Sequence, residues 1–112
     1  MSRRIFIALL SLSSALVLMP QISLAAKNYV AGAMKHTQQA IEHGRRGHAK
    51  ALTIHAEAAL RDAKAEEKVK PNPHIEEAIK HLEQALAEGR NGNAEGGTTH
   101  AEGALRELEQ GK

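Results

Sequence analysis

The sequence is poor in the residue types that build disulfides and aromatic clusters. It contains no cysteine and no tryptophan, and its 112 residues include one phenylalanine, one tyrosine and three prolines. The absence of cysteine excludes disulfides, thiolate metal ligands and thiol nucleophiles. Any binding or chemistry must therefore rely on histidine, aspartate, glutamate and the backbone.

The chain also lacks a large excess of one charge. It has 15 Lys+Arg against 13 Asp+Glu, and two of the arginines, Arg3 and Arg4, belong to the leader described below, so 13 of each sign remain. Nucleic-acid binding requires a basic stripe that neutralises phosphates. Here the two signs are interspersed and Tyr29 is the only aromatic residue after the leader. We therefore expect no nucleic-acid partner.

The first residues have the pattern of a secretory signal peptide. Arg3 and Arg4 precede a mostly apolar run over residues 5–19, and Ser23 and Ala25 form a small-x-small cleavage signal. The apolar run is shorter than the roughly 20 residues that a membrane anchor needs. We expect residues 1–25 to be removed and export to follow the general secretory route rather than the twin-arginine route. Residues 26–112 are then expected to be soluble in the periplasm and free of the membrane.

Most of the remaining chain is an internal duplication with a shift of 45 residues. The shift aligns Lys35-His36 with Lys80-His81, His55-Ala56-Glu57 with His100-Ala101-Glu102, and Ala59-Leu60-Arg61 with Ala104-Leu105-Arg106. Such a repeat is one supersecondary unit used twice. Each unit is divided by a Gly-x-x-Gly turn, at residues 44–47 and 89–92, where glycine supplies the left-handed conformation that ends a helix.

Hydrophobic periodicity predicts four helices. Apolar residues recur at three- and four-residue steps in each half of each unit, and Asn72-Pro73 is typical of an N-cap followed by proline at the first helical position. The sequence thus predicts an all-α, antiparallel four-helix bundle made of two hairpins, at about residues 28–67 and 73–110. Glycines 96 and 97 weaken the last helix, and Thr99 with Glu102 can form a capping box that starts it later, leaving residues 93–98 frayed.

Histidines follow the edge of each apolar stripe. They are His36, His43, His48, His55, His74, His81 and His100. Three pairs of them are seven residues apart, which places both members on one helix face, but seven residues rise about 10.5 Å and a ligand lies about 2 Å from its ion. Two histidines of one helix therefore cannot share a metal ion, and the partner must come from a neighbouring helix.

Antiparallel pairing supplies such partners. Around the two turns, His36 lies level with His55, His43 with His48, and His81 with His100, and helix axes about 8–10 Å apart leave room for two imidazoles to reach one ion. In the second hairpin Glu88 and Asn93 replace the inner histidine pair.

A mixed site is predicted around His74. Glu107 lies at the level of His74, and Glu77 lies on its own stripe, so the two carboxylates are candidate metal ligands with the histidine. Beside the histidines of the second and fourth helices stand small residues that would let rings turn or helices approach: Ala51, Ala58, Gly96 and Gly103.

These features together resemble the small metal-binding protein (SmbP) family. The likeness rests on the repeated Lys-His-x-x-x-Ala-(Ile/Leu) and His-Ala-Glu-x-Ala-Leu segments, the Gly-x-x-Gly turns, the histidines at sevens and the absence of cysteine, and it covers nearly all of residues 26–112. It implies a periplasmic four-helix bundle that binds several divalent ions, copper preferred, in metal buffering or tolerance. The seven histidines match the family's ligands, and Glu88 and Asn93 depart from its richer histidine content.

The chemistry of the candidate ligands independently limits the choice of metal ion. Imidazole and carboxylate without thiolate suit Cu(II), Ni(II) and Zn(II), and the Irving–Williams order ranks Cu(II) first. Two other interpretations remain open: a structural or partner-binding bundle whose histidines only border the core, and an enzyme. We expect no enzyme, because there is no His-Glu-x-x-His motif, no activated nucleophile and little room for a large apolar pocket.

Overall fold

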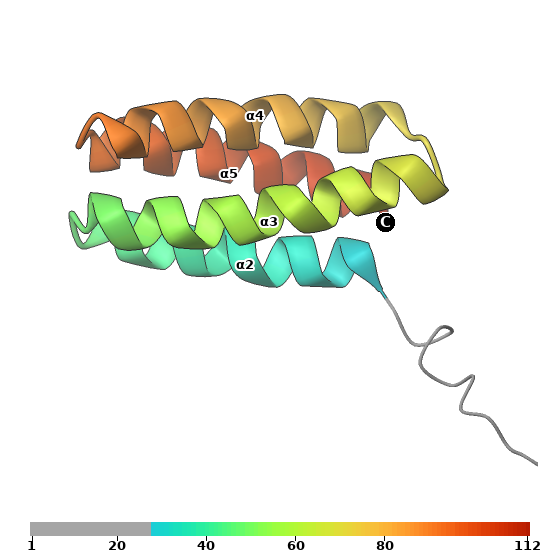
Figure 1. Cartoon of the computed structure of the whole chain (residues 1–112), viewed down its shortest axis with the longest axis horizontal. Helices are drawn as coiled ribbons and strands as arrows, with labels where there is room; N and C mark the ends of the chain where they lie inside the picture. The colour runs from blue at the N-terminus through green and yellow to red at the C-terminus, as the bar shows by residue number, and fades with distance from the viewer. Residues whose placement is uncertain (1–27) are drawn as a thin grey trace, which may run out of the picture.

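The computed structural model describes residues 28–112, and the predicted signal peptide lies outside the described residues. The described chain forms four α-helices, which are α2 (Tyr29–Arg45), α3 (Ala49–Val69), α4 (Pro73–Arg90) and α5 (Ala94–Gly111). They run antiparallel, α2 beside α3 and α4 beside α5 (Figure 1), and residues 28–112 include no strand. The predicted all-α four-helix bundle is confirmed.

The four helices follow one another around the bundle. Besides the two hairpin contacts, α3 packs on α4 and α2 packs on α5. The α2/α3 and α4/α5 seams therefore lie on opposite sides of the bundle. Any site built within one hairpin is separated by the core from a site built within the other.

Local sequence signals account for the helix ends. The side chains of Asn28, Asn72 and Asn93 each cap a helix by accepting a backbone N–H, from Ala31, His74 and Gly96 respectively. At the tight turns, Gly47 and Gly92 both have φ 81°, a left-handed conformation that side chains disfavour.

The first glycine of each turn has a different role from the one predicted. Gly44 and Gly89 are helical and buried, and a Cβ on either would overlap the hydroxyl of Thr98 or Thr53 on the opposite hairpin. Here glycine allows two helices to approach closely.

The last helix begins earlier than the sequence predicted. Asn93 accepts the Gly96 N–H at 3.0 Å, and α5 is helical from Ala94. Thr99 does not cap it, since its hydroxyl donates to the carbonyl of Glu95 within the helix. The predicted fraying of residues 93–98 is therefore wrong, and the reason is tertiary: Gly97 is buried against Leu52, so packing offsets the poor helix propensity of glycine.

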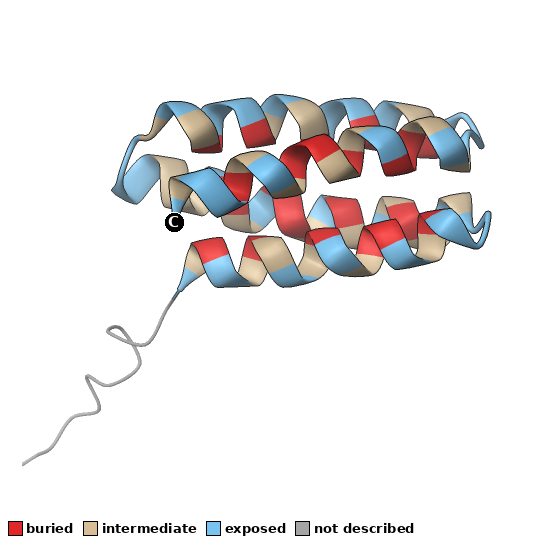
Figure 2. Cartoon of the chain, turned by 180° about the vertical axis from the view of Figure 1, so that it is seen from behind, coloured by how far each residue is buried: buried red, intermediate tan, exposed pale blue. Residues whose placement is uncertain are grey.

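The buried segments of the helices face one another across the bundle (Figure 2), and the buried apolar residues are mostly alanines with a few large aliphatics. Leu52 is fully buried near the turn end of the bundle, where it touches Gly44, Gly89 and Gly97. Leu52 and Gly97 occupy equivalent positions in the two repeats. One hairpin thus inserts a leucine where the other has no side chain.

Ion pairs related by the duplication join the hairpins at their surface. Arg45 contacts Glu102 at 2.8 Å and Arg90 contacts Glu57 at 3.1 Å, and the 45-residue shift converts one pair into the other. These pairs are largely exposed, so each contributes only about 0–1 kcal/mol to stability. Their equivalence shows that the two hairpins are related by an approximate twofold axis.

Between residues 28 and 112, every helix is too short or too polar to cross a lipid bilayer.

Candidate metal centre

The histidines line the two hairpin seams at the border between core and solvent. Six of the seven are partly buried, and His48 is exposed. His48 is also the residue that precedes α3, with φ −92° and ψ 81°, so it is not on a helix face as its spacing from His55 suggested. Its ring nevertheless lies beside that of His43.

All three level-matched pairs are neighbours in the structure. The ring centroids are 6.5 Å apart for His36 and His55, 6.2 Å for His43 and His48, and 6.1 Å for His81 and His100. The first two pairs lie on the α2/α3 seam, and the third lies on the α4/α5 seam. Each pair joins two helices or, for His43 and His48, a helix and the turn that follows it.

These separations can be compared with those of two imidazoles on one ion. With metal–nitrogen bonds of about 2.0–2.1 Å, the two centroids lie about 4.5 Å apart for adjacent ligands and about 6.4 Å apart for opposite ligands. The three pairs fall at the upper end of that range. Chelation therefore requires rotation of the rings about their soft χ2 torsions, with no movement of the helices.

A fourth contact joins the two pairs of the first hairpin, and the level rule did not predict it. His43 and His55 have nearly parallel rings, with an interplanar angle of 4° and centroids 5.0 Å apart. The ring of His55 thus contacts the rings of both His36 and His43. We call the continuous row His36, His55, His43 and His48 the imidazole ladder.

Two ring nitrogens of the site are buried without a partner among the described residues. They are Nδ1 of His43 and Nδ1 of His81. A buried polar atom that makes no hydrogen bond carries a desolvation cost of about 1–3 kcal/mol, which a bound ion would remove. Each hairpin contributes one such nitrogen, and each belongs to a histidine pair.

Space for His81 comes from a glycine on the facing helix. A Cβ on Gly103 would lie 3.0 Å from Nδ1 of His81, closer than a relaxed contact allows. Gly103 therefore lets the ring of His81 pack directly against the backbone of α5.

His36 has polar neighbours that fix its orientation. Its Nδ1–H donates to Oε1 of Gln39 at 3.1 Å, which leaves the Nε2 lone pair free to bind an ion. Nε2 lies 4.0 Å from the carboxylate of Asp62. Sequence reasoning missed Asp62, although two signals pointed to it: it stands seven residues after His55 and is the repeat equivalent of Glu107.

The predicted carboxylate ligands differ in where they lie. Glu107 is in contact with His74, with Nδ1 and Oε1 2.9 Å apart, a spacing that suits both a hydrogen bond and adjacent ligands on one ion. Glu77 is half-exposed and accepts a hydrogen bond from Lys80 at 2.9 Å. That bond and the charge of Lys80 lower the pKa of Glu77, so the negative charge of this carboxylate is already paired with the positive charge of a lysine.

The electrostatics of the ladder disfavour protonation at its centre. Burial, followed by the nearby imidazoles of His43 and His36, lowers the pKa of His55 from its ordinary value of 6.5. His55 therefore stays neutral, and able to bind an ion, to lower pH than a free histidine.

Within the described range, no three side chains of His, Cys, Asp or Glu converge into a set able to hold one ion. The arrangement consists of pairs. In the second hairpin the inner pair is replaced by Glu88 and Asn93, which hydrogen-bond to each other at 2.8 Å.

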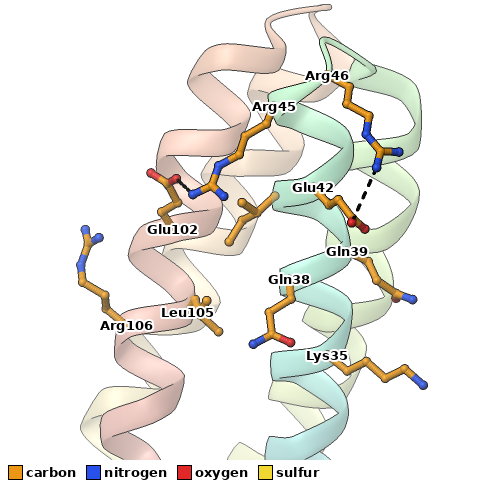
Figure 3. Close-up of a pocket in the computed structure, with 10 residues that line it drawn as sticks. Lys35, Gln38, Gln39, Glu42, Arg45, Arg46, Glu102, Leu105 and Arg106 are labelled. Carbon is orange, nitrogen blue, oxygen red and sulfur yellow. Dashed lines mark hydrogen bonds and ion pairs between the residues drawn. The ribbon is translucent and has the colours of Figure 1, made fainter.

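A surface groove lies away from the histidines, between α2 and α5 (Figure 3). It is lined by charged and amide side chains over a floor that includes Leu105, and Arg45 reaches across it to Glu102. None of its lining residues is a histidine. The candidate metal ligands therefore occupy the hairpin seams and not this groove.

Comparison with known families also points to metal binding. A model of the family described as small metal-binding protein matches residues 5–111. A comparison with curated proteins gives no match.

Proposed function

Because the chain belongs to the small metal-binding protein family, we propose that it binds and buffers divalent transition metal ions in the periplasm, Cu(II) in preference to Ni(II) and Zn(II). The ions are held by imidazole pairs that bridge the helices of each hairpin. The protein carries the ion as cargo and catalyses no reaction.

One observation carries this proposal: the histidines that belong to different helices approach within chelating range. Centroid separations of 6.1–6.5 Å in three pairs are close to the value of about 6.4 Å for two imidazoles on opposite sides of one ion. Histidines that merely border the core have no reason to pair in this way, least of all with buried Nδ1 atoms left without partners.

The ligand number supports buffering over permanent storage. Each pair supplies two nitrogens, and water completes the coordination, so affinity is moderate and the ion exchanges readily. A structural zinc site, by contrast, is closed by four protein ligands. The preference for Cu(II) follows from the Irving–Williams order for nitrogen ligands, and the periplasm follows from the leader pattern of residues 1–25.

The deciding experiment is calorimetric titration of residues 26–112 with Cu(II), Ni(II) and Zn(II). We expect binding in the order Cu(II) above Ni(II) and Zn(II), and a lower stoichiometry for His36→Ala and for His55→Ala. Lys35→Ala is a matched control, because it removes an exposed neighbour of His36 that lies outside the seam. Unchanged stoichiometry in both histidine variants would defeat the site assignment and favour a structural or partner-binding bundle.

A further inference from the structure

The two hairpins offer different sites despite their common sequence. In the first hairpin, four imidazoles form the unbroken ladder, whereas in the second the same positions hold one histidine pair and the hydrogen-bonded Glu88 and Asn93. The central contact, between His43 and His55, has no counterpart in the second hairpin. The ladder is therefore more than two copies of one site.

From this arrangement we infer that the first hairpin holds two metal ions as a coupled pair, one between His36 and His55 and the other between His43 and His48. The inference rests on the proposed function and specifies its stoichiometry and spacing. In the second hairpin, His81 and His100 hold one ion, and the mixed pair of His74 and Glu107 is a separate candidate site.

The pairing follows from counting ligands in the row. Four rings in a line can be divided into two neighbouring pairs in only one way, because a pair made of His43 and His55 leaves His36 and His48 without partners. When metal is scarce, any neighbouring pair can bind one ion. When metal is sufficient, dividing the row into its outer pairs lets all four imidazoles bind, so this state is favoured.

The ring separations limit the distance between the two ions. The ions lie at most about 11 Å apart. This limit is the sum of half of the His36–His55 separation, the whole His43–His55 separation and half of the His43–His48 separation. Two doubly charged ions at that distance repel each other, and solvent screening leaves part of this repulsion. The second ion is therefore expected to bind severalfold more weakly than the first.

Electron paramagnetic resonance with Cu(II) as the probe tests the pair directly. The ladder is isolated in the full-length mature chain by His74→Ala, His81→Ala and His100→Ala together, and circular dichroism verifies that the variant folds. At saturation we expect two Cu(II) per chain, a half-field transition and dipolar broadening. The complementary variant, in which the four ladder histidines and His74 are replaced by alanine, is expected to bind one Cu(II) through His81 and His100 with neither signature.

The second hairpin supplies a matched substitution. Exchanging His43→Glu and His48→Asn gives the first hairpin the residues that stand at the equivalent positions of the second. In the ladder-only background this change is expected to lower the stoichiometry from two to one and to abolish the half-field transition while leaving the helical content unchanged.

Each outcome decides between the coupled pair and its alternatives. A single ion in the ladder-only variant, or two ions without dipolar coupling, would overturn the coupled pair and leave the proposed metal binding intact. Absence of Cu(II) binding in both variants would overturn the coupled pair and the proposed function together.

Discussion

At the scale of single residues, the environment of each imidazole decides what it can do. His55 is surrounded by other rings, His81 has an unpartnered nitrogen above Gly103, and His36 has its tautomer fixed by Gln39. Identical side chains at equivalent spacing therefore differ in their polar partners and in the packing around their rings.

The lowered pKa of His55 predicts a pH dependence of stability without metal. Its folded-state pKa is below its ordinary value of 6.5, so the unfolded chain binds more protons, and stability is complete above pH 6.5 and declines as the pH falls below it. Urea unfolding of the metal-free protein between pH 7.5 and 5.5 should show this decline, and His55→Gln should flatten it. Equal slopes in both proteins would contradict the assignment to His55.

Gly103→Ala should separate metal binding from folding. The added methyl group crowds the ring of His81, so Cu(II) affinity at the His81–His100 pair is expected to fall severalfold. Metal-free stability is expected to change by no more than about 1 kcal/mol, because alanine is the better helix former. Ala58→Gly is the comparison at the equivalent position of the first hairpin. If Gly103→Ala binds Cu(II) as tightly as the original protein, the added methyl group does not restrict the ring of His81, and this prediction is contradicted.

At the scale of the elements, capping and packing together fix where helices begin. Asparagine caps α2, α4 and α5, and His48 precedes α3 without a side-chain cap. The start of α5 lies at Ala94, where Asn93 makes the cap, and not at the capping box expected from Thr99.

Two alanine substitutions should discriminate between these starts. Asn93→Ala removes the bond to the Gly96 N–H and is expected to cost about 1 kcal/mol of unfolding free energy. Thr99→Ala removes only an exposed hydroxyl bond within the helix and is expected to change stability by less than about 0.5 kcal/mol. Chemical denaturation of both variants measures the difference, and the reverse ranking would support a helix that starts at Thr99.

At the scale of the whole molecule, the duplicated hairpins associate through an asymmetric contact. Leu52 fills the space that its repeat equivalent, Gly97, leaves open, while Gly44 and Gly89 bring the helices close on either side. Two identical hairpins would place either two leucines or two glycines at this position. The difference between the repeats is thus part of what fits them together.

Exchanging these two residues tests the fit. Leu52→Gly is expected to cost about 2–5 kcal/mol through the cavity it leaves, and Gly97→Leu about 1–3 kcal/mol through overpacking. The combination Leu52→Gly with Gly97→Leu should recover part of the loss, giving a coupling of about 1–3 kcal/mol in a double-mutant cycle. Should a single variant be unfolded, a helical double variant by circular dichroism still shows the coupling. If the stability losses of Leu52→Gly and Gly97→Leu simply add in the double variant, the two positions do not share one packing space.

The sequence by itself determined the four helices, the two turns, the duplication and the partners of the three histidine pairs. These properties are local or follow from the helical period and antiparallel pairing, which assign a level to every residue. Tertiary structure alone decided the contact between His43 and His55, the 4.0 Å approach of Asp62 to His36 and the early start of α5. Those features depend on helix offsets, ring rotations and packing between hairpins, and such distances are set by residues far apart in the chain.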